Sequence, residues 1–138
     1  MEQTKLITSL NEDLELEYRS IVQYVLHIST VKGAEYQSTL DELGIHVKQE
    51  LDHALVLARQ IEFLGGTPST RVPEVPPEVD PRRALRQDLE LEEGQLQRYR
   101  DRVEQATQAG LPDVAESLAP LLQQTQEHVR DLRGALGT

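Results

Sequence analysis

The sequence contains no cysteine and no tryptophan, and it is poor in basic side chains. The absence of cysteine excludes disulfides, thiolate zinc sites, iron–sulfur clusters and cysteine nucleophiles. With 24 acidic and 14 basic residues, the formal net charge is −10. Because phosphate backbones and anionic lipids bind cationic surfaces, we expect neither nucleic acid nor a membrane as a partner.

Long apolar runs are also missing. Hydrophobic residues make up 38% of the chain, and they are spread out rather than gathered into a run of about 18 or more that could cross a bilayer. The first five residues lack the basic-then-apolar layout of a signal peptide. The sequence therefore predicts a soluble, cytoplasmic protein, and its 138 residues fit a single domain over 1–138 with a hydrophobic core.

Glycine and proline divide the chain into four segments. Breaks occur at Gly33, at Gly65 and at Gly110. Residues 65–80 hold four prolines, which indicates an extended connector that is neither helix nor strand. Asp80-Pro81 has the form of an N-cap followed by proline at the first helical position, so we expect a helix to begin there.

Each of the four segments carries apolar residues at steps of three and four, which is the helical period. Strand-like alternation does not persist, and no internal sequence repeat is evident. The pattern predicts an all-α fold, a four-helix bundle with two short links and one long crossover between the second and third helices. The expected inward positions are Leu10, Leu14, Ile21, Val25 and Ile28; Leu40, Leu43, Val47, Ala54, Leu57, Ile61 and Leu64; Leu85, Leu89, Leu96, Val103 and Ala106; and Val114, Leu118, Leu121, Val129, Leu132 and Leu136.

Several polar residues occupy positions that these stripes reserve for the core. They are Glu17 in the first segment, Glu50 and His53 in the second, Glu92 in the third, and Thr125 and His128 in the fourth. Counted from the turns at about 1.5 Å per residue, they fall in one layer of the bundle. Buried carboxylates need a compensating cation or proton, and no inward lysine or arginine shares their register. A metal best supplies the missing charge, and mixed carboxylate and imidazole ligands suit iron or manganese, with zinc possible.

These residues resemble the ferritin-like di-iron carboxylate superfamily, and the local sequence is most similar to bacterioferritin. The resemblance is carried by the segments 17–24, 61–68 and 88–92 and covers nearly the whole chain. It implies a ferritin-like four-helix bundle that binds one or two iron ions and oxidises Fe(II) with dioxygen or peroxide. It also implies a homodimer or larger homo-oligomer, in which the first two helices are the usual pairing face.

The same resemblance implies how the ligands are shared. Glu17, Glu50 and His53 would hold one metal, Glu92 and His128 would hold the other, and Glu50 would bridge the two. The chain departs from the family at two positions. Thr125 stands where the family has a second bridging glutamate, and Leu51 stands where bacterioferritin has its haem-ligating methionine, so no haem of that type is expected.

The loss of the glutamate leaves the metal content open. Glu127 points about 200° around the helix from Thr125 and is a poor substitute. Two divalent ions carry four positive charges against three inward carboxylates, so a fully occupied pair would be incompletely neutralised. A mononuclear site, an asymmetric pair with a water or hydroxide bridge, and a degenerate site are all compatible with the sequence.

Three further residues have alternative interpretations. Tyr24 lies seven residues after Glu17 on the same face, where it could bond to a ligand carboxylate such as Glu92, pass an electron, or simply fill the core. His46 could be an accessory ligand or a proton relay, but a partly exposed and inert histidine is favoured. We expect His27 at the surface or in an interface between subunits.

Three functions are compatible with this pattern. The first is a ferritin-like metal-binding protein with ferroxidase or other iron-handling activity. The second is a non-catalytic bundle that acts through assembly or partner binding, which Thr125 and the proline Pro120 in the last helix favour. The third is a DNA-protecting mini-ferritin, but the net charge, the absence of a basic tail and ligands placed within one bundle argue against it.

Overall fold

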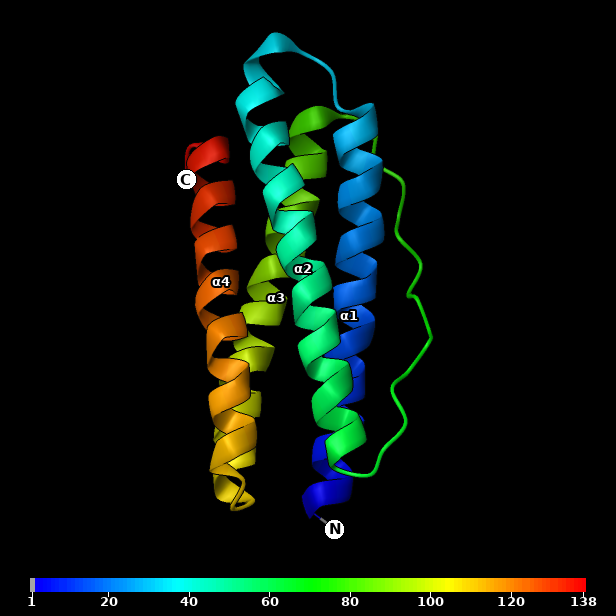
Figure 1. Cartoon of the computed structure of the whole chain (residues 1–138). Helices are drawn as coiled ribbons and strands as arrows, with labels where there is room; N and C mark the ends of the chain where they lie inside the picture. Colours follow the sequence, from blue (N-terminus) through cyan, green and yellow to red (C-terminus); the bar gives the residue numbers. More distant parts are fainter. Residues whose placement is uncertain (1) are drawn as a thin grey trace.

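The computed structural model describes residues 2–138, which form four long helices and one short 3₁₀ turn. The helices are α1 (Glu2–Thr30), α2 (Gln37–Phe63), α3 (Pro81–Gln108) and α4 (Pro112–Leu136), and the turn is η1 (Ala34–Tyr36). The described residues include no strand. The helices lie side by side along their length (Figure 1), which confirms the expected all-α four-helix bundle.

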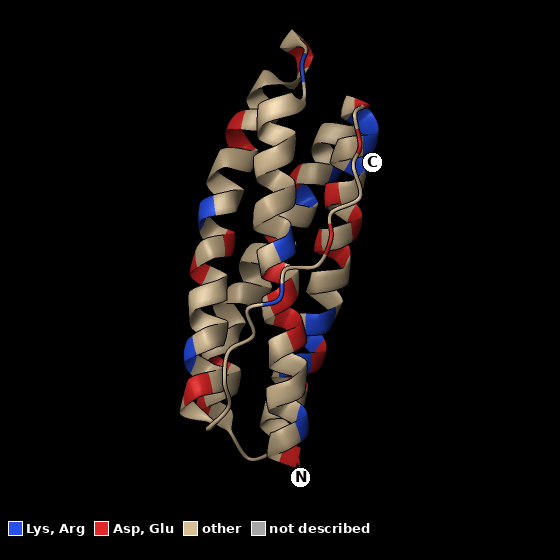
Figure 2. Ribbon diagram, turned by 90° about the vertical axis from the view of Figure 1, so that its right-hand side faces the viewer, with Lys and Arg blue, Asp and Glu red and all other residues tan. Residues whose placement is uncertain are grey.

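The long connection between α2 and α3 sets the directions of the helices. Residues 65–80 pass along the outside of α1 from one end of the bundle to the other (Figures 1 and 2). As a result α3 starts at the end where α2 starts, as the sequence predicts, and each of the two helical hairpins is antiparallel. The connection is fastened to α1, because the Tyr18 hydroxyl donates to the Ser69 carbonyl at 2.8 Å and the Ser69 amide donates to Asn11 at 2.7 Å.

Local chemistry fixes where the helices begin and end. The Asp80 side chain accepts a hydrogen bond from the Arg83 amide at 3.0 Å, with proline at the first helical position, as expected for an N-cap. Gly65 and Gly110 adopt φ of 91° and 77°, a region that favours glycine. The last helix continues through Pro120 without interruption.

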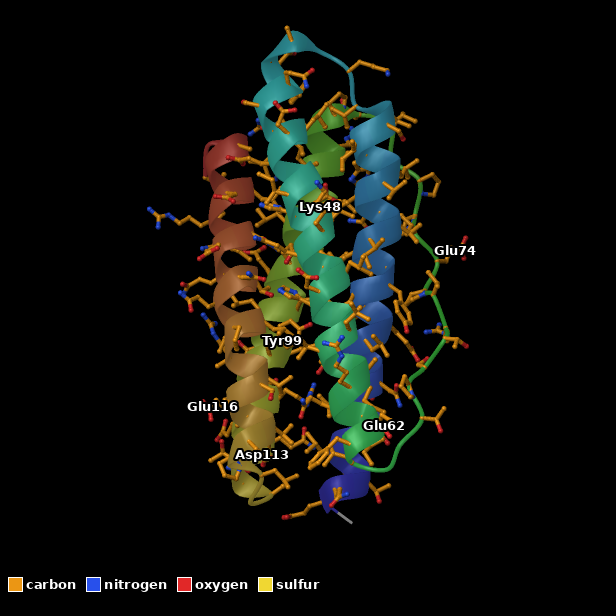
Figure 3. The ribbon with its side chains drawn as sticks, viewed as in Figure 1. Lys48, Glu62, Glu74, Tyr99, Asp113 and Glu116 are labelled. Atoms are coloured by element: carbon orange, nitrogen blue, oxygen red, sulfur yellow. The ribbon has the colours of Figure 1, made fainter. Side chains whose placement is uncertain are left out.

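Two apolar clusters fill the interior on either side of a polar layer. The larger one includes Leu10, Leu57 and Leu118, and the smaller one includes Leu43 and Leu132. Figure 3 shows Tyr99 among the side chains that fill the interior, whereas Glu74 points away from the bundle. None of the helices within residues 2–138 is long and apolar enough to span a membrane.

One apolar position of the first stripe is wrongly predicted. Val25 is 56% exposed, although its spacing from the other stripe residues suggests the core. It lies eight residues after Glu17, so its side chain points about 80° to one side of the buried direction of α1. The described residues leave that side of α1 largely uncovered at this height, as the exposure of Val25 shows.

Candidate metal centre

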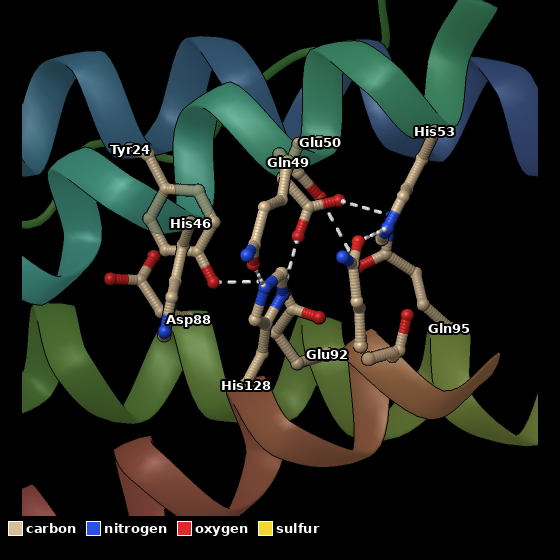
Figure 4. Close-up of polar contacts among 12 residues, drawn as sticks. Tyr24, His46, Gln49, Glu50, His53, Asp88, Glu92, Gln95 and His128 are labelled. Atoms are coloured by element: carbon tan, nitrogen blue, oxygen red, sulfur yellow. Dashed lines mark hydrogen bonds and ion pairs between the residues drawn. The ribbon is translucent and has the colours of Figure 1, made fainter. Parts of the chain in front are cut away.

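The five candidate ligands converge in the polar layer between the apolar clusters. Glu17, Glu50, His53, Glu92 and His128 are each no more than 1% exposed. They form two overlapping groups, Glu17 with Glu50 and His53, and Glu50 with Glu92 and His128, and within each group one ligand atom per residue lies within 4.8 Å of the others. All four helices therefore contribute to one compact centre, in which Glu50 belongs to both groups (Figure 4).

Both histidines direct Nδ1 toward the carboxylates. Nδ1 of His128 lies 2.9 Å from Oε1 of Glu50 and 3.4 Å from Oε1 of Glu92. Nδ1 of His53 lies 3.6 Å from Glu50 and 3.7 Å from Glu17. The opposite ring nitrogens face two glutamines, because Nε2 of His128 is 2.6 Å from Oε1 of Gln49 and Nε2 of His53 is 2.7 Å from Oε1 of Gln124.

Many polar atoms of the centre are buried without a partner. Oε2 of Glu17, both carboxylate oxygens of Glu50, Oε2 of Glu92 and Nδ1 of both histidines have no hydrogen-bond partner among residues 2–138. Buried polar atoms are normally hydrogen-bonded, and leaving them unsatisfied is costly. Carboxylate oxygens and imidazole nitrogens are also the donor types that iron and manganese accept. The residues present therefore fit a bound cation.

Tyrosines hold the two outer carboxylates in place. The Tyr24 hydroxyl donates to Oε1 of Glu92 at 2.7 Å, the contact that the sequence suggests for it. The Tyr99 hydroxyl donates to Oε1 of Glu17 at 2.5 Å, and the Gln95 amide donates to the same oxygen at 3.1 Å. Burial and the adjacent carboxylates raise the pKa of both tyrosines well above the ordinary value, so both phenols remain protonated donors.

The carboxylates of the centre differ in their tendency to ionise. Burial, together with the charges of Glu17 and Glu92, raises the pKa of Glu50 well above its ordinary value. Burial also acts to raise the pKa of Glu92, but the nearby His128 and Glu50 and the hydrogen bond from Tyr24 outweigh it and lower this pKa to about 2. Of these two carboxylates Glu50, the residue common to both groups, is therefore the one that holds a proton more readily.

The site contains an internal repeat that the apolar stripes do not reveal. Matching residues are separated by the same 75 positions: Glu17 and Glu92, Tyr24 and Tyr99, Gln49 and Gln124, and His53 and His128. The contacts repeat as well, because each tyrosine donates to the glutamate of the other hairpin. The expectation of no internal repeat is therefore wrong for the residues of the centre.

Thr125 breaks this repeat, because it is the match of Glu50. It is fully buried, and its hydroxyl donates to the Leu121 carbonyl of its own helix at 2.7 Å. Glu127 is exposed, as the helical geometry predicts, and does not replace the missing carboxylate. The half of the centre next to α4 thus has one protein carboxylate fewer than the repeat would supply.

The expectation of a surface position for His27 is wrong. Its side chain is fully buried, and Nδ1 lies 2.8 Å from both carboxylate oxygens of Asp88, which also accepts a hydrogen bond from Gln23. His27 points about 80° away from Glu17 around α1, but on the side opposite to Val25. That side faces α3, so the packing of α1 against α3 buries the His27 side chain.

His46 is buried rather than partly exposed. It is 3% exposed, its Nε2 lies 3.0 Å from Oδ2 of Asp131, and its ring stacks on that of His128 with centroids 4.0 Å apart. Burial, with a contribution from charge on His128, lowers the pKa of His46. It precedes Glu50 by four residues, so it shares the buried face of α2 one turn away.

Sequence reasoning missed a buried ion pair one turn from the site. Nε of Arg102 lies 2.6 Å from Oδ2 of Asp13, and Arg98 donates to the other oxygen of the same carboxylate. Asp13 precedes Glu17 by four residues and therefore lies on the same face of α1, which is a signal for burial. Its partner on α3 is identified only by the packing of the two helices.

The chain matches the family model described as ferritin-like domain over residues 7–138. Among solved structures it is similar to that of ferritin-like, diiron-carboxylate proteins from Bacillus anthracis strain Ames, with 32% identity, a TM-score of 0.94, and coverage of 99% of this chain and 98% of the other. A dodecameric thioferritin from Bacteroides fragilis, described as bacterioferritin-related, shares the fold with 24% identity, a TM-score of 0.84, and coverage of 98% and 86%. None of the curated proteins matches the chain significantly.

Proposed function

This chain belongs to the ferritin-like family, and from that premise we propose that it binds iron inside the bundle and oxidises Fe(II) with dioxygen or peroxide. The observation that carries the proposal is the convergence of buried, unpartnered oxygen and nitrogen atoms from all four helices. The diiron-carboxylate description of the Bacillus anthracis proteins, at 32% identity, supports iron as the metal. Manganese and zinc accept similar donors.

The ligands divide into two proposed metal positions. The first position is held by Glu17, Glu50 and His53, and the second by Glu50, Glu92 and His128. Because Glu50 serves both, the two ions would influence each other directly. The centre takes up one or two ions, because Thr125 leaves the two positions without a second shared carboxylate.

Fe(II) is the substrate of the proposed reaction. Two Fe(II) ions give up one electron each, and with two protons these electrons reduce dioxygen to hydrogen peroxide. The protein supplies geometry, ligands and a dry interior. Tyr24 and Tyr99 hold the outer carboxylates through hydrogen bonds, and Glu50 releases its proton when a cation arrives. We propose that Tyr24 acts in the reaction, since its hydroxyl contacts a ligand carboxylate.

A second candidate is a non-catalytic bundle with a mononuclear or degenerate site that acts through assembly or partner binding. The specific observation in its favour is Thr125, whose hydroxyl is engaged with its own helix and leaves one ligand position unfilled. The two candidates differ in whether bound Fe(II) reacts with dioxygen.

Anaerobic titration of metal-free protein with Fe(II), followed by exposure to dioxygen in an oxygen electrode, tests the proposal. We expect tight binding of one or two ions per chain and oxygen uptake that Glu50→Gln abolishes. Glu127→Gln, on the exposed surface of α4, is the matched control and should behave as the wild type. Binding without oxygen uptake would favour the second candidate with a mononuclear site, and absence of binding would contradict the first candidate and leave only a degenerate site.

We also propose that the chain forms a cytoplasmic homodimer or larger homo-oligomer. Large apolar side chains are exposed on the two helices of the first hairpin: Val22 and Val25 on α1 are 45% and 56% exposed, and Leu51 and Leu55 on α2 are 54% and 46% exposed. Apolar surface of this kind is favourably buried in an interface between subunits.

A further inference from the structure

We propose that Gln49 and Gln124 are positioning residues that fix the tautomers of His128 and His53 and, as neutral amides, keep both metal positions exchangeable. The inference rests on the proposed metal-binding function. Its basis is the pair of short contacts from Oε1 of Gln49 to Nε2 of His128, at 2.6 Å, and from Oε1 of Gln124 to Nε2 of His53, at 2.7 Å. Figure 4 shows the Gln49 side chain extending alongside the His128 ring.

These contacts determine which ring nitrogen carries the proton. An amide oxygen can only accept a hydrogen bond, so Nε2 of each histidine must be the N–H that donates to it. The neutral ring then keeps its lone pair on Nδ1. In both histidines Nδ1 is buried without a hydrogen-bond partner within residues 2–138 and faces the carboxylates. Each glutamine thus presents the free lone pair of one histidine to one metal position.

The two glutamines act reciprocally across the bundle. Gln49 is on α2 and holds the histidine of α4, whereas Gln124 is on α4 and holds the histidine of α2. His53 belongs to the position that includes Glu17, and His128 belongs to the position that includes Glu92. Each metal position therefore depends on a different glutamine, and the two can be perturbed one at a time.

The neutrality of the amide has a consequence for affinity. A carboxylate at the same place would add negative charge behind the imidazole and make Nδ1 a stronger donor to a cation. The amide orients the ring without that charge. Both glutamines are half-buried, so they also separate the histidines from solvent. An oriented but modestly basic ligand suits an ion that is a substrate and must leave again.

Four variants and one control test the inference with Zn²⁺ as the probe. Gln49→Leu and Gln124→Leu remove the acceptor at similar volume, whereas Gln49→Glu and Gln124→Glu keep an acceptor oxygen and add charge. Gln123→Leu alters an exposed position of α4 and is the matched control. Zinc affinity is measured by calorimetry, zinc release by transfer to a chelator, and the ring nitrogens of the zinc-loaded protein by NMR.

We expect Gln124→Leu to weaken one zinc position by about 10–100-fold, the usual effect of losing an outer partner of a metal ligand. The Nε2–H signal of His53 should then be lost to solvent exchange while that of His128 persists, and Gln49→Leu should give the mirror result. The glutamate variants should retain both signals, bind zinc about tenfold more tightly and release it more slowly. Gln123→Leu should match the wild type.

Wild-type affinity and unchanged ring signals in both leucine variants would overturn the inference and leave the proposed metal site intact. If a leucine variant does not fold, the glutamate variants decide, because unchanged zinc affinity and release in both would also overturn it. Failure of the wild-type protein to bind zinc or Fe(II) would instead overturn the proposed function, and this inference with it.

Discussion

Tyr24 and Tyr99 are equivalent in the internal repeat, and each donates to one outer carboxylate. We expect both Tyr24→Phe and Tyr99→Phe to fold, because phenylalanine keeps the packing of the ring. Each should weaken iron binding about tenfold, since a hydrogen bond to a charged group contributes roughly 1.5 kcal/mol. At saturating Fe(II), Tyr24→Phe should also slow oxidation in stopped-flow absorbance, because the variant lacks the hydroxyl that contacts Glu92. A rate equal to that of the wild type would remove the proposed role of Tyr24 in the reaction.

Thr125 is the residue at which the two halves of the centre differ. Thr125→Glu would restore the match to Glu50 and should raise the number of ions bound per chain, or their affinity about tenfold or more, because a fourth carboxylate balances the charge of two divalent ions. Calorimetric titration with Fe(II) under anaerobic conditions measures both quantities. Thr125→Val is the control. An unchanged titration would show that the missing carboxylate does not limit binding.

Protonation of the centre should make metal binding depend on pH. The pKa of Glu50 is raised from an ordinary value of 4.5, and that of His53 is raised from 6.5. Burial is the main cause for Glu50; for His53, burial acts the other way and the contacts with Glu17 outweigh it. A group whose pKa is raised on folding stabilises the folded protein when it is protonated. This contribution is fully present below the pKa that the group has in the unfolded chain, and it is lost as the pH rises through the pKa in the folded protein. A bound cation takes the place of the protons on Glu50 and His53, so the metal-bound protein does not lose this stability as the pH rises.

The increase in Tm caused by Zn²⁺ should therefore grow as pH rises from about 5.5 to about 8. Thermal unfolding followed by circular dichroism, with and without metal at each pH, measures this difference. A stabilisation that shrinks with rising pH would mean that protons do not compete with the metal for these ligands.

The sequence predicts the five inward ligand candidates because each interrupts an apolar stripe at steps of three or four residues. It does not predict Gln49 and Gln124, which directly precede inward positions and so point about 100° away from them. Their contacts depend on how closely α2 and α4 approach each other. Helical periodicity gives the direction of a side chain but not the distance to the neighbouring helix.

At the scale of helices, boundaries are largely determined by local chemistry. Asp80-Pro81 predicts the start of α3, and the glycines at 65 and 110 predict the ends of α2 and α3, because these residues act through their own backbone geometry. The buried faces are less well predicted. Val25 and His27 lie at similar angles on opposite sides of Glu17, yet the first is exposed and the second is buried. Only the position of α3 distinguishes them.

The seam between α1 and α3 offers a test of how these helices are held together. Arg102 is 6% exposed and pairs with the buried Asp13, so Arg102→Met would leave that carboxylate short of positive charge. We expect the free energy of unfolding to fall by about 3 kcal/mol, which is the lower end of the range for a broken buried pair. The lower end applies because Arg98 still contacts Asp13. Urea unfolding measures the change, with Arg100→Met on the exposed face as the control. A loss no larger than that of the control would contradict a stabilising role.

At the scale of the whole molecule, the crossover places two similar hairpins around one centre. Basic positions are interspersed among the more numerous acidic ones along the helices (Figure 2), and this mixed charge does not single out one face for contact with another copy. The exposed apolar residues of α1 and α2 are the clearer candidates for such a contact. The sequence shows their periodicity but not their exposure, because exposure depends on which faces the four helices leave uncovered.

Leu51 and Leu55 lie one turn apart on the same face of α2. We expect sedimentation of the wild-type protein to show a dimer or larger oligomer, and Leu51→Glu with Leu55→Glu to shift it toward the monomer, because charged side chains are costly to bury in an interface. The fold should persist, since both positions are exposed within one chain. A wild-type protein that sediments as a monomer would contradict the proposed assembly.

The central claim is that the buried carboxylates and histidines hold metal ions inside the bundle. Crystals grown anaerobically with Fe(II), measured on both sides of the iron absorption edge, test it most directly. The account predicts anomalous density between Glu17, Glu50 and His53, between Glu50, Glu92 and His128, or at both of these positions. Iron bound only at surface carboxylates, with no anomalous density among these five residues, would contradict it.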